Sequence, residues 1–93
     1  MKILVVTAHP GDFETGMGGL VARLVGLKHK IFSVVLAPGR NRGETDTRRE
    51  ESWKSHELVG AECSVHTFQI GNLPVTQESR EALKRNFLSF VPD

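Results

Sequence analysis

The sequence predicts an α/β domain in which helices cover both faces of a parallel sheet. Two observations predict it. Short apolar runs rich in Val and Ile alternate with segments of helical periodicity, and each apolar run ends at Pro or Gly. The chain of 93 residues suffices for one small domain or part of a larger one. We therefore expect the order β-α-β-α-β-α in a Rossmann-like, three-layer α/β/α arrangement with right-handed crossovers.

Strands are expected at three places. Lys2–Thr7 and Ile31–Leu36 are continuous apolar runs, which is typical of buried parallel strands. Ser64–Ile70 is a weaker and more polar third strand, and Leu73-Pro74 forms the turn after it.

Helices are expected between and after these strands. Apolar residues recur at helical spacing from Gly16 to about His29. After a loop at 41–47, Asp46 or Thr47 is expected to cap a second helix that runs to about Leu58 and ends at Gly60. Thr76 is expected to cap the third helix, whose predicted buried stripe consists of Leu83, Phe87, Leu88 and Phe90.

The predicted sheet lacks a strand beside its first strand. In doubly wound sheets the first strand usually lies inside the sheet, with a fourth strand on its open side. Residues 1–93 end with Pro92-Asp93, as if that strand should come next, so we expect them to be the N-terminal part of an incomplete domain. The bare edge of the first strand, with four apolar residues that we expect to be uncovered, predicts a homo-oligomer or pairing with a missing C-terminal half. These residues are Leu20, Leu24, Phe87 and Phe90.

The composition argues against several kinds of site and partner. Twelve Lys and Arg residues are balanced by eleven Asp and Glu residues, so no general attraction to nucleic acid is expected. A single cysteine, Cys63, permits no internal disulfide and no cysteine-based zinc site. No run approaches the roughly 20 apolar residues of a membrane span, and no signal peptide is recognisable. We expect a cytoplasmic protein.

The turn after the first strand holds the candidate ligand-binding residues. His9 and Asp12 lie three positions apart where the carboxyl end of a parallel strand meets a helix, which is where open α/β sheets bind ligands. An imidazole and a carboxylate suit Zn²⁺, although a histidine beside Pro10 is also common in loops without metal. The glycines Gly16, Gly18 and Gly19 could indicate a dinucleotide site, but Pro10 and two acids interrupt the turn that such a site needs, and Ala22 takes the late glycine position.

Ala8–Gly19 resembles the signature of the PIG-L/LmbE-like family of zinc-dependent N-acetylglucosaminide deacetylases. The family pattern is Ala-His-Pro-Asp-Asp-x-Glu-x-Gly-x-Gly-Gly, and this chain departs from its specified positions only at Gly11. The resemblance continues along the chain, at Arg48-x-x-Glu51, Gly60, Gly71-Asn72-Leu73-Pro74 and Pro92-Asp93. It covers the whole chain but only about the first half of a family domain.

The resemblance implies a role for each matching residue. His9 and Asp12 match two of three zinc ligands, and residues 8–12, which carry them, are called the ligand loop. Glu14 supports this loop, and Arg48 lies near the substrate, an N-acetylated sugar or glycoconjugate. Gly11 takes the place of the aspartate that serves as general base, and the third ligand, a histidine, comes from the later half of the family domain. His29, His56 and His66 do not replace it. The resemblance thus predicts weak or absent zinc binding and a chain inactive by itself. A non-catalytic binding or self-assembling module remains the alternative.

Overall fold

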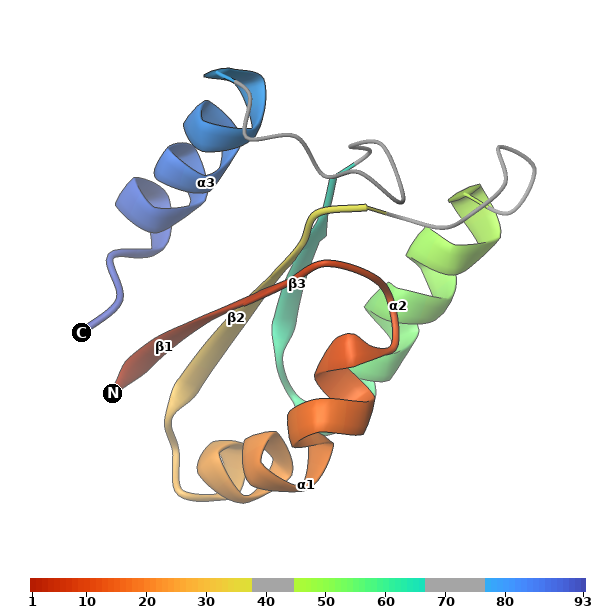
Figure 1. Ribbon diagram of the computed structural model, residues 1–93. Coiled ribbons are helices and arrows are strands. Elements are labelled where there is room, and N and C mark those ends of the chain that lie inside the picture. The colour runs from red at the N-terminus through yellow and green to blue at the C-terminus, as the bar shows by residue number, and fades with distance from the viewer. Residues whose placement is uncertain (38–44, 67–76) are drawn as a thin grey trace.

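The sheet has three parallel strands in the order β1-β2-β3, so β1 lies at one edge (Figure 1). The computed structural model describes residues 1–37, 45–66 and 77–93. The strands are β1 (Lys2–Thr7), β2 (Lys30–Val35) and β3 (Glu62–Val65). Lys2 pairs in register with Lys30. Both apolar runs form strands, with β2 one residue earlier than predicted. Most of β2 is buried, as expected of a parallel strand, whereas in β1 only Val5 is buried and Val6 is 47% exposed.

Helices cover both faces of this sheet, which confirms the three-layer α/β/α fold. Helices α1 (Asp12–Gly26) and α2 (Thr45–Val59) pack on one face, where they also contact each other. Helix α3 (Gln77–Phe90) packs on the opposite face, against β1 and β2 (Figure 1). The chain therefore alternates strand and helix in the predicted order β-α-β-α-β-α.

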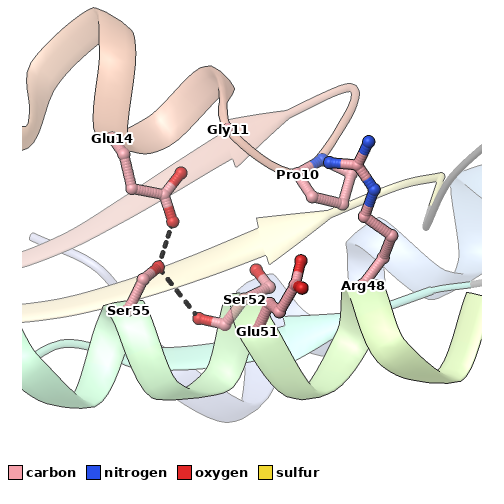
Figure 2. Close-up of a pocket in the computed structure, with 7 residues that line it drawn as sticks. All are labelled: Pro10, Gly11, Glu14, Arg48, Glu51, Ser52 and Ser55. Carbon is pink, nitrogen blue, oxygen red and sulfur yellow. Dashed lines mark hydrogen bonds between the residues drawn. The ribbon is translucent and has the colours of Figure 1, made fainter.

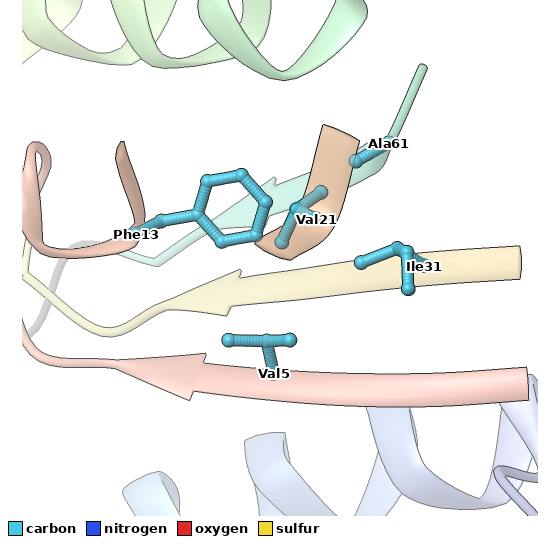
Figure 3. Close-up of a cluster of buried hydrophobic side chains, with 5 residues drawn as sticks. All are labelled: Val5, Phe13, Val21, Ile31 and Ala61. Atoms are coloured by element: carbon cyan, nitrogen blue, oxygen red, sulfur yellow. The ribbon is translucent and has the colours of Figure 1, made fainter. Parts of the chain in front are cut away.

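The hydrophobic core lies between α1 and the sheet (Figure 3). Phe13 and Val21 of α1 point toward β1 and β2, and each has at most 1% of its surface exposed. Burial of a Val or Phe side chain stabilises a domain by about 1.5–3 kcal/mol, so these two residues hold α1 to the sheet. The core cluster consists of Val5, Phe13, Val21, Ile31 and Ala61.

Helix α1 begins earlier than the glycine pattern predicts. It starts at Asp12, not Gly16, and ends at Gly26 before reaching His29. Gly11 has a φ of 98°, a left-handed conformation that turns the loop sharply into the helix. The three glycines that follow are therefore helical, because packing of Phe13 and Val21 outweighs their unfavourable helix propensity of about 1 kcal/mol each. The glycine-rich turn of a dinucleotide site does not form.

Helix α2 also begins before its predicted cap. It starts at Thr45, so Asp46 and Thr47 lie in its first turn and neither is the cap residue. Its predicted end is confirmed: α2 stops at Val59, and Gly60 has a left-handed φ of 80°. A Cβ atom at that glycine would lie 2.8 Å from Val25 Cγ1 of α1, so glycine also allows the two helices to pack closely.

Strand β3 occupies Glu62–Val65, two residues earlier than predicted. Residues 67–70 of the predicted third strand, the turn at Leu73-Pro74, the cap at Thr76 and residues 41–44 of the predicted loop lie outside the described residues.

The predicted apolar stripe of α3 is partly wrong. Ala82 is the buried residue of this helix, while Phe87 and Leu88 are 53% and 61% exposed. Phe90 is covered, since its ring stacks on Phe32 of β2 at 5.4 Å between centroids. On the other face of the sheet, Leu24 packs against the core and is likewise covered, so of the four residues expected to be uncovered Leu20 and Phe87 are the exposed ones.

None of the helices within the described ranges has the length and apolar character that a membrane crossing requires.

Candidate functional site

The turn from β1 into α1 brings His9, which lies in the loop, close to Asp12, the first residue of α1, at the carboxyl end of β1. The carboxylate Oδ2 of Asp12 accepts a hydrogen bond from the backbone N–H of His9 at 3.0 Å, and the backbone N–H of Asp12 donates to the His9 carbonyl at 3.3 Å. The His9 Nδ1 atom lies 3.9 Å from the same Asp12 oxygen. Both side chains are about half exposed, so the loop presents them to solvent in a geometry fixed by its own hydrogen bonds.

This pair fits part of a zinc site. An imidazole nitrogen and a carboxylate oxygen are both zinc ligands, but a catalytic site takes three protein ligands. Across residues 1–37, 45–66 and 77–93 no three His, Cys, Asp or Glu side chains gather as a metal site would need. His9 and Asp12 would hold the ion together with a ligand from outside the described residues.

Gly11 leaves the middle of the ligand loop without a side chain. A Cβ atom built there meets no atom within 4 Å, so the space for a side chain is open. The φ of 98° is a conformation that most residues with a Cβ avoid, and Asn and Asp tolerate it better than others. The loop therefore accepts an aspartate more readily than most residues.

A cavity of about 200 Å³ adjoins this loop (Figure 2). One wall comes from the start of α1 and the loop before it, and the other comes from α2, whose residues 48, 51, 52 and 55 recur at helical spacing on one face. Five of the seven lining residues carry polar groups (two carboxylates, one guanidinium and two hydroxyls), but most of the surface exposed in the cavity is apolar. The lining residues are Pro10, Gly11, Glu14, Arg48, Glu51, Ser52 and Ser55.

Glu14 links α1 to α2. Its Oε1 atom accepts a hydrogen bond from the Ser55 hydroxyl (Figure 2), and it lies 3.8 Å from Nδ1 of His56. The resemblance implies that Glu14 supports the ligand loop; the hydrogen bond observed here goes to α2 instead. The acid thus fixes the distance between the two walls of the cavity.

His56 is buried beside this link. Only 1% of its surface is exposed, its ring stacks on Phe13 at 4.1 Å between centroids, and its Nδ1 atom lies 2.6 Å from the Ser52 carbonyl oxygen. Because a carbonyl only accepts, Nδ1 carries the proton and donates to it. The sequence marks His56 only as a mid-helix histidine, and Ser52 and Ser55 carry no signal beyond their helical spacing from Arg48.

We expect Ser55→Ala to destabilise the protein by about 1–2 kcal/mol, because it leaves the Glu14 carboxylate without its hydroxyl donor. Urea denaturation followed by circular dichroism measures this change. Ser89→Ala is the matched control, since that hydroxyl is exposed and its loss should cost less than about 0.5 kcal/mol. If Glu14→Ala and Ser55→Ala were fully additive in a double-mutant cycle, the link between the helices would be energetically unimportant.

The remaining histidines and the cysteine lie apart from the ligand loop. The Nδ1 atom of His29 is 2.7 Å from the terminal amine of Met1, and His66 contacts Asn86 on α3 at 2.9 Å. Burial, followed by the charges of two arginines, lowers the pKa of His66, which keeps it neutral at pH 7. Burial raises the pKa of the Cys63 thiol, so this group stays protonated and is a poor nucleophile or metal ligand.

A comparison with models of protein families identifies the family of this chain. The model of the PIG-L family, GlcNAc-PI de-N-acetylase, matches residues 4–93, which is nearly the whole chain. The chain belongs to the PIG-L family. Within this PIG-L chain, the segment that resembles the family signature comprises the loop after β1 and the first turns of α1.

Similar proteins extend well beyond the matched part. The diacetylchitobiose deacetylase of Thermococcus kodakarensis is 29% identical in an alignment 94 positions long, which covers 88% of the PIG-L chain and 34% of that enzyme. This chain therefore spans about a third of the length of that curated relative.

Two solved structures share the fold. The N,N'-diacetylchitobiose deacetylase of Pyrococcus horikoshii matches 99% of the PIG-L chain with a TM-score of 0.88, and GalB, the 4-carboxy-2-hydroxymuconate hydratase of Pseudomonas putida, matches 98% with a TM-score of 0.87. Both are 24% identical, and the chain covers 38% and 44% of them respectively. One of them is a deacetylase and the other a hydratase, so this fold alone does not select the reaction.

Proposed function

We propose that this chain forms the ligand-loop part of a zinc-dependent sugar de-N-acetylase that removes the acetyl group from a GlcNAc-type sugar. The single observation that carries the proposal is the placement of His9 and Asp12 at the turn into α1, where Pro10 and Gly11 between them line the cavity. Membership of the PIG-L family and the relationship to diacetylchitobiose deacetylases support the substrate class.

Each residue has a role in this proposal. His9 and Asp12 hold the metal, and zinc, when bound, supplies Lewis-acid activation of the amide carbonyl. Arg48 and Glu51 of α2 line the cavity and offer a donor and an acceptor for sugar hydroxyls. Gly11 has no group that can take a proton, and loss of a positioned base costs about 10²–10⁴-fold in rate. The chain by itself therefore has negligible turnover.

Zinc titration of the chain tests the metal role. Because two of three ligands are present, we expect binding weaker than a Kd of about 1 μM. His9→Ala and Asp12→Ala should each abolish it, whereas His66→Gln, away from the loop, should leave it unchanged. Binding that survives both loop variants would contradict the assignment, and submicromolar binding through the loop would mean that the chain supplies a third ligand.

A non-catalytic assembly module is the second candidate. The exposure of Leu20 and Phe87 favours it, because apolar side chains exposed on two helices can bind a partner or a second copy. Analytical ultracentrifugation at low protein concentration distinguishes the assembly module from the de-N-acetylase. A stable monomer argues against self-assembly, and a defined oligomer without zinc binding argues for it.

A further inference from the structure

His56 of α2 contacts the first turn of α1, the turn that begins with Asp12. Its ring stacks on Phe13 at 4.1 Å between centroids, with 25° between the ring planes, and its Nδ1 atom lies 3.8 Å from Oε1 of Glu14. Phe13 and Glu14 are the two residues that directly follow Asp12. A side chain of the second helix therefore touches the chain immediately beyond the proposed metal ligand.

The ligand loop needs such an anchor, because its own backbone restrains it little. Gly11 precedes Asp12, and glycine adopts left-handed and right-handed conformations about equally readily, so no side chain enforces the φ of 98° at this position. The hydrogen bonds between His9 and Asp12 tie these two residues to each other and not to the rest of the protein. The direction of the Asp12 carboxylate consequently depends on how the first turn of α1 is held.

Phe13 holds that turn. Its ring packs with Val5 and Ile31 of the sheet (Figure 3) and also stacks against His56. These contacts leave only 1% of its surface exposed. Successive residues of a helix lie about 100° apart around its axis, so a Phe13 side chain fixed in one orientation also fixes the direction of Asp12, one residue earlier.

Stability alone does not explain a histidine at position 56. Its Nδ1 atom donates to the Ser52 carbonyl at 2.6 Å, which fixes the orientation of the ring. Its Nε2 atom is buried and has no hydrogen-bond partner among the described residues, and a buried acceptor left in this way is unfavourable. An apolar side chain of similar size would avoid that cost, but it would present no oriented planar ring to Phe13.

We propose that His56 is a positioning residue for the metal site, which holds the Asp12 carboxylate in place by stacking on Phe13. The inference rests on the proposed function, since it concerns the zinc ion that His9 and Asp12 would hold. Groups that orient metal ligands typically contribute about 10–100-fold to metal affinity. Because only 1% of His56 is exposed, it acts through the first turn of α1 and not by contact with the substrate.

Two signals from NMR spectroscopy of the chain test the proposal. The His9 amide proton, which is donated to Oδ2 of Asp12, reports the position of that carboxylate without any metal, and a zinc titration followed at the same amide reports the affinity. In His56→Ala we expect this proton to lose the downfield shift of a bond to a carboxylate, and zinc to bind at least about tenfold more weakly. His56→Leu fills the space of the ring, so it should keep the fold and change both signals in the same direction.

Two further variants separate positioning from stability. His56→Phe keeps a planar ring on Phe13, so it should restore the His9 shift and most of the zinc affinity. Val34→Ala removes a fully buried side chain on the opposite face of the sheet, two residues from the Phe32 ring that stacks on α3. It should lower the Tm and leave both the His9 shift and the zinc affinity unchanged.

An unchanged His9 shift and zinc affinity in both His56→Ala and His56→Leu would overturn the proposal. Equal changes in Val34→Ala would do the same, as would a His56→Phe variant no better than His56→Leu. Zinc binding that survives Asp12→Ala contradicts the proposed function instead. The response of the His9 amide to His56→Ala does not require zinc, so the proposed function and this inference can fail separately.

Discussion

A Gly11→Asp substitution is expected to raise the rate of sugar deacetylation by about 10²–10⁴-fold, the typical contribution of a positioned general base. The position lies in the ligand loop, between the two residues assigned to the metal, and lines the cavity. An aspartate there has open space for its Cβ atom. The left-handed φ of 98° costs a residue with a side chain roughly 1–2 kcal/mol of folding stability, so the variant should be less stable even where it is faster.

The measurement needs a complete domain. A hybrid in which this chain replaces the matching segment of the Thermococcus diacetylchitobiose deacetylase supplies the remaining residues. Acetate release from diacetylchitobiose is then compared for glycine, aspartate and asparagine at position 11. Asparagine tolerates the same backbone conformation but accepts no proton, so it should resemble glycine. Equal rates for aspartate and asparagine would show that position 11 does not supply the base.

Phe13→Ala is expected to destabilise the protein by about 3–5 kcal/mol. The ring is 1% exposed, belongs to the core cluster and stacks on the buried His56, so its removal opens a cavity where α1 meets the sheet and α2. A domain of this size has a modest core, and total stabilities are commonly about 5–15 kcal/mol. The variant should therefore lose a large share of its stability, and its Tm should fall by more than about 12 °C.

Thermal denaturation followed by circular dichroism measures this effect, with the fluorescence of Trp53, the single tryptophan, as a second probe located on α2. Phe87→Ala is the matched control: that ring is 53% exposed on α3, and its loss should cost less than about 1 kcal/mol. Similar losses for the two variants would mean that the stack of Phe13 on His56 does not organise the core.

The first two strands were predictable because a continuous apolar run in the sequence is a local signal of a parallel strand, a signal that the more polar third strand lacks. Residues 2–7 and 31–36 needed no information from elsewhere in the chain. The start of α1 was not predictable in the same way. Three glycines at 16, 18 and 19 disfavour a helix locally, and only the burial of Phe13 and Val21 against the sheet makes the segment helical.

The candidate site shows the same difference between what local sequence determines and what tertiary packing determines. His9 and Asp12 are close in sequence, so their proximity follows from a short turn and could be predicted. The contact of Glu14 with Ser55 joins residues 41 positions apart, and only the packing of α1 against α2 brings them together. The burial of His56 was equally inaccessible, because the Phe13 ring that covers it belongs to α1, and only the packing of the two helices brings that ring against α2.

The link between α1 and α2 has a consequence for how this site can be changed. The cavity has two walls, one carrying the ligand loop and the other carrying Arg48 and Glu51. Because Glu14 and Ser55 hold the walls together farther along the helices, substitutions at 48 and 51 leave both the loop and that link untouched. Engineering one face of α2 can thus change the lining of the cavity while the turn that carries His9 and Asp12 is kept constant.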